Sequence, residues 1–353
     1  MKPRRIARLF CTFFISGILI APSAPAAIEL SGSGASFPYQ IYSIWFMLFG
    51  RENKDVHITY TPKGSGGGIR DFQNHVVDFA ASDAAMSDEE IHKVGEEVQL
   101  LPMTAGEVVL AYNLPGVAEL RLPRCVYPDI FLGKITRWND PAITSANPDS
   151  KLPDLEITVI TRRDSSGTTF VFTRHLSAIS ETFASGPGFG KKVAWPTELH
   201  MVSSAINAGI SSSVSTIPGA IGYIDYGFAS LAGLQMATLE NKAGNFIAPG
   251  HQAGMAALAS QEMPENMIAW LSDPLGPDSY PITTYTWMMF YRQYHSPEKA
   301  AAINQMIGYF LDVGQQLSAR YGYIPLPRKV TDQVRTAAAT IGATNKNLTP
   351  PQP

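Results

Sequence analysis

The chain has 353 residues, of which 45% are hydrophobic and 16% are charged. That composition excludes a disordered chain and a coiled coil, and the length predicts two domains rather than one. The formal net charge is −3 at neutral pH. The chain therefore offers no basic surface for a phosphate backbone, and we expect no nucleic-acid partner.

The first 26 residues have the layout of a secretory signal peptide. Four basic residues and no acidic ones lie within the first eight positions, an apolar run follows at 9–20, and the small residues of APSAPAA come next. The run has 12 residues, whereas a membrane span needs about 20. We expect cleavage of residues 1–26, which removes four positive charges and changes the net charge from −3 to −7.

Cys125 is then the only cysteine, which excludes an intramolecular disulfide and a cysteine-based metal site.

Strand and helix patterns alternate along the rest of the chain. Strands are predicted at 55–62, at the start of 77–95, at 107–116, at 155–163, between two turns of 217–229 and at 280–291. Helices are predicted after a glycine turn in 31–53, in 63–77, from Ser87, at 168–180, at 296–323 and at 325–341. The first helix would bury Phe37, Ile41, Trp45 and Leu48 on one side. This alternation predicts an α/β fold.

Three junctions in this pattern place glycines and hydroxyls before a helix, namely GSGASFP at 32–38, GSGGGI at 64–69 and SSGTTF at 165–170. A helix start presents unpaired N–H groups at the positive end of the helix dipole, and glycine lets the backbone approach a ligand closely. Such starts bind oxyanions, although serine and threonine are also the commonest N-caps. The candidate anion-binding residues are Ser36, Phe37 (through its amide), Ser65, Ser166, Gly167 and Thr168.

Two charged positions add to these junctions. Arg162 offers the planar fork that matches a tetrahedral oxyanion, and Asp164 could hold that fork in place. Asp83 lies in a loop of small residues after a strand, where a carboxylate would repel an anion unless the anion carries a proton. Hydrogen phosphate carries one at neutral pH and sulfate does not, so Asp83 predicts rejection of sulfate.

Seven motifs match one known family in order: GSGASFP, PKGSGGGI, VDFAASDAAMSDEE, FLGKITRWND, RRDSSGTTFVFT, WP and IPGAIGYIDY. The chain resembles the periplasmic phosphate-binding proteins of Pst-type ABC importers from about residue 28 to 340. The resemblance implies a type II periplasmic binding protein, in which two α/β lobes joined by hinge strands close on one phosphate. It implies that the protein is not an enzyme, needs no cofactor or metal, and works as a monomer with membrane permease subunits in the periplasm.

The resemblance also implies lobe limits and ligand contacts. Lobe I would comprise 27–103 and 283–342, lobe II would comprise 104–282, and 343–353 would be a loose tail. The chain would cross between lobes near 103–107 and 281–284. Phosphate would be bound by Ser36, Phe37, Ser65 and Asp83 of lobe I and by Arg162, Ser166, Gly167 and Thr168 of lobe II, with Asp164 supporting Arg162. The family commonly has threonine at the position of Ser36, and the glycine-rich stretch that usually follows WP is absent from residues 197–210.

Other functions stay open at this point. A secreted phosphatase could use Ser166 or Thr168 as its nucleophile, but it would need a base or a metal beside that hydroxyl. The histidines after residue 26 are scattered singly, and no P-loop, dinucleotide fingerprint or G-x-S-x-G elbow is present. A binder of sulfate or molybdate is the other alternative, and Asp83 is the feature against it.

Overall fold

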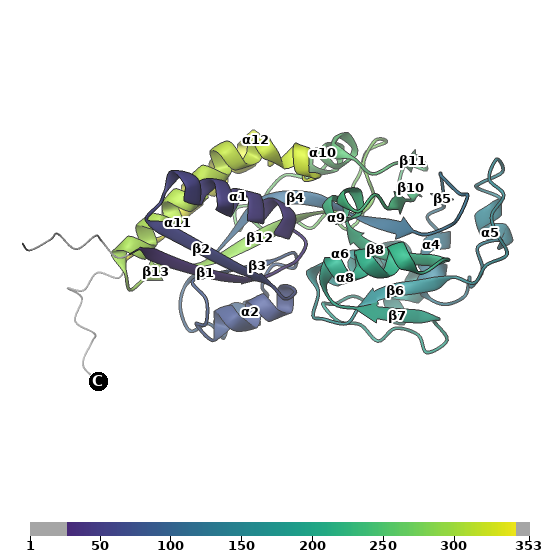
Figure 1. The fold of residues 1–353 in the computed structure, drawn as a ribbon, viewed down its shortest axis with the longest axis horizontal. Coiled ribbons are helices and arrows are strands. Elements are labelled where there is room, and N and C mark those ends of the chain that lie inside the picture. Colours follow the sequence, from purple (N-terminus) through teal and green to yellow (C-terminus); the bar gives the residue numbers. More distant parts are fainter. Residues whose placement is uncertain (1–26, 344–353) are drawn as a thin grey trace, which may run out of the picture.

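A computed structural model describes residues 27–343 as two α/β halves that lie side by side (Figure 1). The expected signal peptide lies outside the described residues, as does the expected tail apart from its first residue. We call the half around β1, β2, β3 and β12 lobe I, and the half around β6, β7 and β8 lobe II. The residue limits given above for the lobes stay a prediction.

One sheet runs through both lobes, with strand order β2-β1-β3-β12-β4-β8-β6-β7 and β9 paired to β4. Its strands are β1 (Ile28–Gly34), β2 (Val56–Pro62), β3 (Phe79–Ser82), β4 (Val98–Tyr112), β6 (Thr158–Arg162), β7 (Met201–Ser204), β8 (Ala220–Asp225), β9 (Gln235–Met236) and β12 (Thr283–Tyr291). In lobe I, β1 pairs in parallel with β2 and β3, while β12 is antiparallel to β3. In lobe II, β6 pairs in parallel with β7 and β8.

The long strand β4 joins the two halves of the sheet. Its first part pairs with β12, from Val98 opposite Tyr291 to Glu107 opposite Thr283. Its last part, from Val108 to Tyr112, pairs with β8 of lobe II. Almost every residue of β4 is buried, which explains its nearly continuous apolar sequence. This strand is therefore shared by the two lobes and links them within one sheet.

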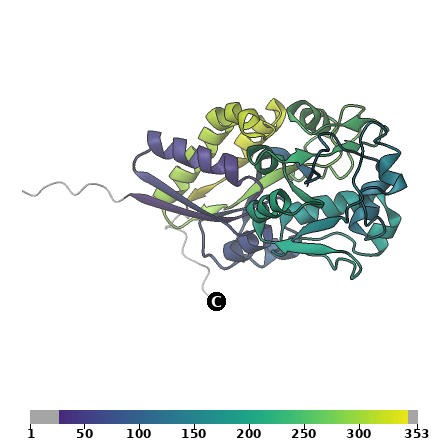
Figure 2. The ribbon, with the colours of Figure 1, turned by 45° about the vertical axis from the view of Figure 1, so that its right-hand side comes forward.

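Helices cover both faces of the lobe I sheet. The helices of this lobe are α1 (Tyr39–Glu52), α2 (Ser65–Gln73), α3 (Asp88–His92), α11 (Pro297–Tyr309), α12 (Gln315–Ser318) and α13 (Arg328–Ala338). Helices α1 and α11 lie on one side of the sheet and α2 on the other in both views (Figures 1 and 2). Between α11 and α12 the chain forms one turn of π-helix at Phe310–Gly314. Trp45 of α1 packs on the Phe310 ring, and its Nε1 donates to the Gly314 carbonyl oxygen at 3.1 Å.

Lobe II contains more short elements. Its helices are α4 (Val126–Phe131), α5 (Pro141–Thr144), α6 (Gly167–Ile179), α7 (Glu181–Ser185), α8 (Ile206–Thr216) and α9 (Tyr226–Leu231), whereas α10 (His251–Ala259) contacts β12. A small second sheet has the order β11-β10-β5, from β5 (Arg121–Leu122), β10 (Thr238–Glu240) and β11 (Phe246–Ile247). Within residues 27–343, no helix has the length and apolar character that crossing a membrane requires.

The structure corrects several details of the predicted elements. Residues 31–34, expected in a turn, belong to β1, and the strand expected from 107 begins at Val98. The segment after 225, expected as a turn, is helix α9. The helix expected at 296–323 is interrupted by the π-helical segment at Phe310–Gly314. Leu48 is only partly buried, because α1 turns Tyr42, Phe46 and Phe49 inward beside Ile41 and Trp45. Ala343, expected to begin a loose tail, ends strand β14 (Gly342–Ala343), which pairs with β13 (Gln293–Tyr294).

Candidate functional site

The three glycine- and hydroxyl-rich junctions meet where the two lobes touch. The Gly66 amide of lobe I donates to the Ser165 carbonyl oxygen of lobe II at 2.9 Å. A Cβ atom added to Gly167 would clash with Ser65 Oγ and would lie 2.6 Å from Asp83 Oδ2. All eight predicted anion-binding residues are buried there: Ser36, Phe37, Ser65, Asp83, Arg162, Ser166, Gly167 and Thr168.

The first junction lies between β1 and α1. Ser36 and Phe37 precede α1, which begins at Tyr39, and their amides donate to no backbone carbonyl within residues 27–343. The Phe37 carbonyl oxygen accepts a hydrogen bond from the Tyr323 hydroxyl at 2.7 Å. The Phe37 ring is fully buried and packs edge-on against the Tyr323 ring. Packing therefore fixes this turn while its N–H groups stay available to a ligand.

The second junction places Ser65 as the first residue of α2, directly after Gly64. Gly64 has a φ of 85°, a left-handed conformation that favours glycine. Ser65 Oγ accepts the Asp83 amide N–H at 3.2 Å and lies 3.5 Å from Asp83 Oδ2. The hydroxyl at this helix start is thereby held against the carboxylate.

Asp83 is the acidic member of the site and directly follows β3. Its Oδ1 accepts a hydrogen bond from Thr286 Oγ1 of β12 at 2.8 Å. Burial raises the pKa of Asp83 to about 7, although the Thr286 hydrogen bond and the positive charge of Arg162 oppose that rise. This carboxyl group can therefore accept or release a proton near neutral pH.

Arg162 ends β6, and its side chain is 1% exposed. Asp164 accepts from its Nε at 2.8 Å and from its Nη2 at 2.6 Å. Burial raises the pKa of Asp164, but the hydrogen bonds and charge of Arg162 outweigh burial and hold that pKa below its usual value. Nη1 donates to Thr168 Oγ1 at 3.3 Å and to Asn207 Oδ1 at 2.9 Å. The structure thus places Asp164 against the guanidinium, as the sequence suggested, whereas Arg163 is exposed.

The third junction begins α6. Ser166 is the N-cap, and its Oγ accepts from the Thr169 amide at 3.1 Å. The capping role that the sequence also allowed for this serine is therefore present. Gly167 and Thr168 are the first two residues of the helix, so their N–H groups have no partner within it. Thr169 Oγ1 and the Tyr223 hydroxyl lie 2.8 Å apart and tie the helix start to β8.

Asn207, the second residue of α8, was not among the predicted site residues. It is fully buried, and besides accepting from Arg162 it donates its backbone N–H to Ser36 Oγ of lobe I at 3.2 Å. Residues 197–210 lack the expected glycine-rich stretch. Within those residues only Asn207, Gly209 and Ile210 resemble the family pattern, and this resemblance does not show that α8 begins against the other lobe.

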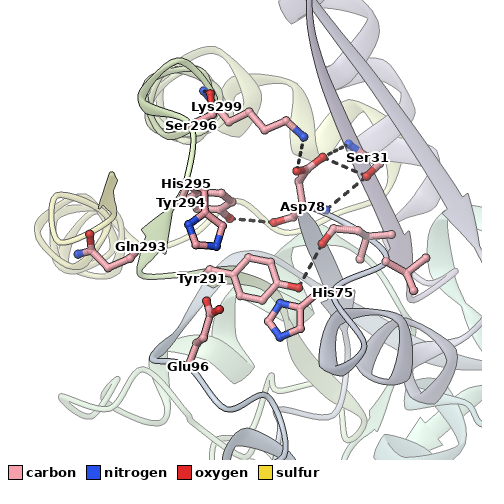
Figure 3. Close-up of a pocket in the computed structure, with 12 residues that line it drawn as sticks. Ser31, His75, Asp78, Glu96, Tyr291, Gln293, Tyr294, His295, Ser296 and Lys299 are labelled. Carbon is pink, nitrogen blue, oxygen red and sulfur yellow. Dashed lines mark hydrogen bonds and ion pairs between the residues drawn. The ribbon is translucent and has the colours of Figure 1, made fainter. Parts of the chain in front are cut away.

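A pocket elsewhere in lobe I shares no lining residue with this site (Figure 3). It has a volume of about 430 Å³ and lies between the end of β12 and the start of α11. Asp78 accepts there from the amide and hydroxyl of Ser31 and from Lys299 Nζ at 2.6 Å. The Tyr291 hydroxyl donates to the carbonyl oxygens of Phe72 and Val77. These polar groups satisfy one another, and within residues 27–343 no three metal-ligating side chains cluster as a metal site would require.

Comparisons with known proteins agree on one family. A family model described as the PBP superfamily domain matches residues 20–313. The chain is 34% identical over 334 residues to the phosphate-binding protein PstS of Pasteurella multocida, covering 94% of this chain and 93% of that protein. It is also 34% identical over 314 residues to the PstS of Haemophilus influenzae, covering 88% and 92%.

Solved structures show the same fold. A high affinity periplasmic phosphate-binding protein (PfluDING), solved with phosphate bound, superposes with a TM-score of 0.72 at 20% identity, covering 88% of this chain and 93% of that chain. This likeness supports the two-lobe architecture. With relatives at 34% identity over nearly the whole chain, the protein belongs to the PBP superfamily and, within it, to the family of PstS phosphate-binding proteins.

Proposed function

We propose that this protein binds one hydrogen phosphate ion between its lobes and delivers it to an ABC importer. Its relatives are named phosphate-binding proteins, and the two-lobe fold suits closure around a ligand. The proposed contacts are Ser36, Phe37, Ser65, Asp83, Arg162, Ser166, Gly167 and Thr168, with Asp164 holding Arg162. No cofactor or metal takes part.

The observation that carries this proposal is Asp83 beside Arg162 in one buried site. Arg162 and the helix starts supply donors that attract any oxyanion. When it is ionised, Asp83 supplies an acceptor, and an anion that brings its own proton can donate to that acceptor. Burial raises the pKa of Asp83 to about 7, so the carboxyl group and the anion can share a proton near neutral pH. An ion without a proton brings another acceptor against the ionised carboxylate, and two buried acceptors that face each other without a donor cost about 1–3 kcal/mol.

Contacts from both lobes couple binding to closure. Ser36, Ser65 and Asp83 come from lobe I, whereas Arg162 and the start of α6 come from lobe II. An anion that contacts both sets binds the closed arrangement more tightly than an open one, and it shifts the population by that difference. A transporter could then distinguish loaded from empty protein by its shape.

Catalysis is the weaker alternative. His175 lies on α6, the helix that begins beside Ser166 and Thr168. Its Nε2 lies 2.7 Å from the Tyr127 hydroxyl and its Nδ1 lies 2.7 Å from the Ser272 carbonyl oxygen. Burial lowers the pKa of His175 to about 4. Both ring nitrogens are engaged in hydrogen bonds that do not involve Ser166 or Thr168, and the lowered pKa makes the imidazole a weak base, so His175 offers neither hydroxyl a general base.

The remaining parts of the proposal concern location and partners. We propose that residues 1–26 are a cleaved signal peptide and that the mature protein works in the periplasm as a monomer. Lobe I comprises 27–103 and 283–342, and lobe II comprises 104–282. The partners are inorganic phosphate and the membrane permease subunits of the importer, and nucleic acid is not a ligand.

Equilibrium dialysis with labelled phosphate tests this function. Purified protein should retain the label at equal concentrations of protein and phosphate, and an equal concentration of sulfate should leave most of the label in place. Displacement by sulfate would indicate a general oxyanion binder. Failure to retain the label at all would contradict phosphate binding.

A further inference from the structure

Asn207 connects the two sides of the proposed phosphate site. Its backbone N–H donates to Ser36 Oγ of lobe I at 3.2 Å. Its side-chain Oδ1 accepts from Arg162 Nη1 of lobe II at 2.9 Å. Asn207 therefore contacts a proposed phosphate-binding residue of each lobe. It is also fully buried, so these contacts are shielded from water.

The side-chain amide nitrogen of Asn207 is a donor without an acceptor. Nδ2 is buried and has no hydrogen-bond partner within residues 27–343. The opposite amide orientation would turn the NH2 group toward the Arg162 cation, so Arg162 fixes Oδ1 on its own side. Buried polar groups are almost always hydrogen-bonded, and an unpaired one destabilises the protein. Nδ2 therefore needs an acceptor that the described chain does not supply.

The backbone before Asn207 is held in a strained conformation. Ile206 has a φ of 51°, in the left-handed region that a β-branched residue rarely occupies. Its N–H donates to Asp164 Oδ1 at 2.9 Å, and the same oxygen accepts from Arg162 Nε. Such strain persists only where surrounding contacts enforce it, and it concentrates at ligand sites. The strained backbone at Ile206 orients the start of α8 so that Asn207 contacts both Ser36 and Arg162.

We propose that Asn207 is an additional phosphate-binding residue whose Nδ2 donates a hydrogen bond to an oxygen of the anion. This inference rests on the proposed function and deepens it. A neutral amide adds a donor without adding charge, and it bonds best to an anion oxygen that carries no proton. Asp83 requires an oxygen that carries one. Together the two residues determine which oxygen of hydrogen phosphate bears the proton.

Two substitutions separate the donor from the acceptor of this side chain. Asn207→Ala removes both, whereas Asn207→Asp keeps an acceptor for Arg162 but has no N–H to give. Each variant should bind phosphate at least tenfold more weakly than the wild-type protein in calorimetry. A loss of phosphate affinity smaller than tenfold in either variant would overturn the proposal. Absence of phosphate binding by the wild-type protein would instead refute the proposed function itself.

Direct contact between Asn207 Nδ2 and phosphate can be measured in the wild-type protein. The test therefore stays valid if a variant fails to fold. With phosphate bound, the Asn207 side-chain 15N signal should show a through-hydrogen-bond coupling to 31P. The signal is assigned in the wild-type protein by through-bond correlation of the side-chain amide with the Asn207 backbone. Asn241 is the matched control, because its Nδ2 is buried and donates to the carbonyl oxygens of Gly276, Pro277 and Ser279. An Asn207 signal without coupling would show that the residue only positions Arg162, and it would overturn the proposal.

Discussion

The carboxylate of Asp164 holds the guanidinium of Arg162 at two points, with Oδ1 2.8 Å from Nε and Oδ2 2.6 Å from Nη2. This pairing occupies one edge of the guanidinium and leaves Nη1 to face Thr168 and Asn207. Oδ1 also accepts the Ile206 N–H. One carboxylate therefore fixes the cation of the proposed site and the start of α8 together.

Replacing Arg162 by lysine should weaken phosphate binding at least tenfold. Lysine carries a point charge and cannot bond Asp164 at two positions while also reaching the anion. Calorimetric titration measures the change. Arg163→Lys is the matched control because the neighbouring side chain is exposed, and it should bind like the wild type. Equal affinities in the two variants would show that the guanidinium fork is not used.

Asp83→Asn should reduce the preference for phosphate over sulfate at least tenfold. An amide can donate to an unprotonated oxygen where the carboxylate must accept a proton, so the variant no longer penalises sulfate. The ratio of the two dissociation constants is the measured quantity. Asp88→Asn serves as control, since Asp88 is an exposed residue in the first turn of α3. An unchanged ratio in Asp83→Asn would contradict the role given to this carboxyl group.

The same variant should change how stability depends on pH. Burial raises the pKa of Asp83 from 3.8 to about 7, so the folded protein holds this proton more tightly than the unfolded chain. The stabilisation is complete below the unfolded pKa and is lost as pH rises through the folded one. Without phosphate, the wild type should lose more unfolding free energy than Asp83→Asn between about pH 4 and about pH 7. Urea denaturation tests this, and parallel curves would be the contrary result.

Gly167→Ala should block close approach of the lobes. The new methyl group would clash with Ser65 Oγ and approach Asp83 Oδ2 to 2.6 Å, so phosphate affinity should fall at least tenfold. Gly308 lies within α11 and has no neighbouring atom within 4 Å of an added Cβ. Gly308→Ala should bind phosphate normally and raise stability by about 0.5–1 kcal/mol. Normal binding by Gly167→Ala would show that the lobes need not touch at this point.

An ion pair between Lys191 of lobe II and Glu90 of lobe I should slow phosphate release. Their side chains are 22% and 24% exposed, so the pair contributes about 0–1 kcal/mol and is screened by salt. Lys191→Met should therefore release phosphate up to about fivefold faster at low salt, with the difference shrinking as salt rises. Stopped-flow displacement measures the rate. Lys93→Met removes an ion pair with Glu89 that lies within lobe I, and it should leave the release rate unchanged. Equal release rates in the two variants would show that the Lys191–Glu90 ion pair does not slow phosphate release.

Local signals predicted much of the fold. Strand β2 alternates between more and less exposed residues as its sequence does. Ser87 and Glu90 form the capping box that marks the start of α3, and Ser296 caps the helix that begins at Pro297. Each of these signals acts within a few residues, so a single sequence contains all the information they need.

Contacts between residues far apart in the sequence explain where the structure differs from the sequence-based predictions. The glycines of 31–34 suggested a turn, yet they lie in β1 because strand partners on both sides satisfy their backbone. An added Cβ on Gly32 would meet the Phe79 ring of β3, so this glycine serves close approach within a sheet. Asn207 was missed for a similar reason. Its partners, Ser36 and Arg162, lie 171 and 45 residues away, and no local pattern encodes such contacts.

Calorimetry of the wild-type protein with orthophosphate, followed by a separate titration with sulfate, tests the central claim most directly. A buried cage that combines donors with one proton acceptor predicts saturable heat at one phosphate per chain and much weaker binding of sulfate. No heat with phosphate, or equal heat with both anions, would contradict it.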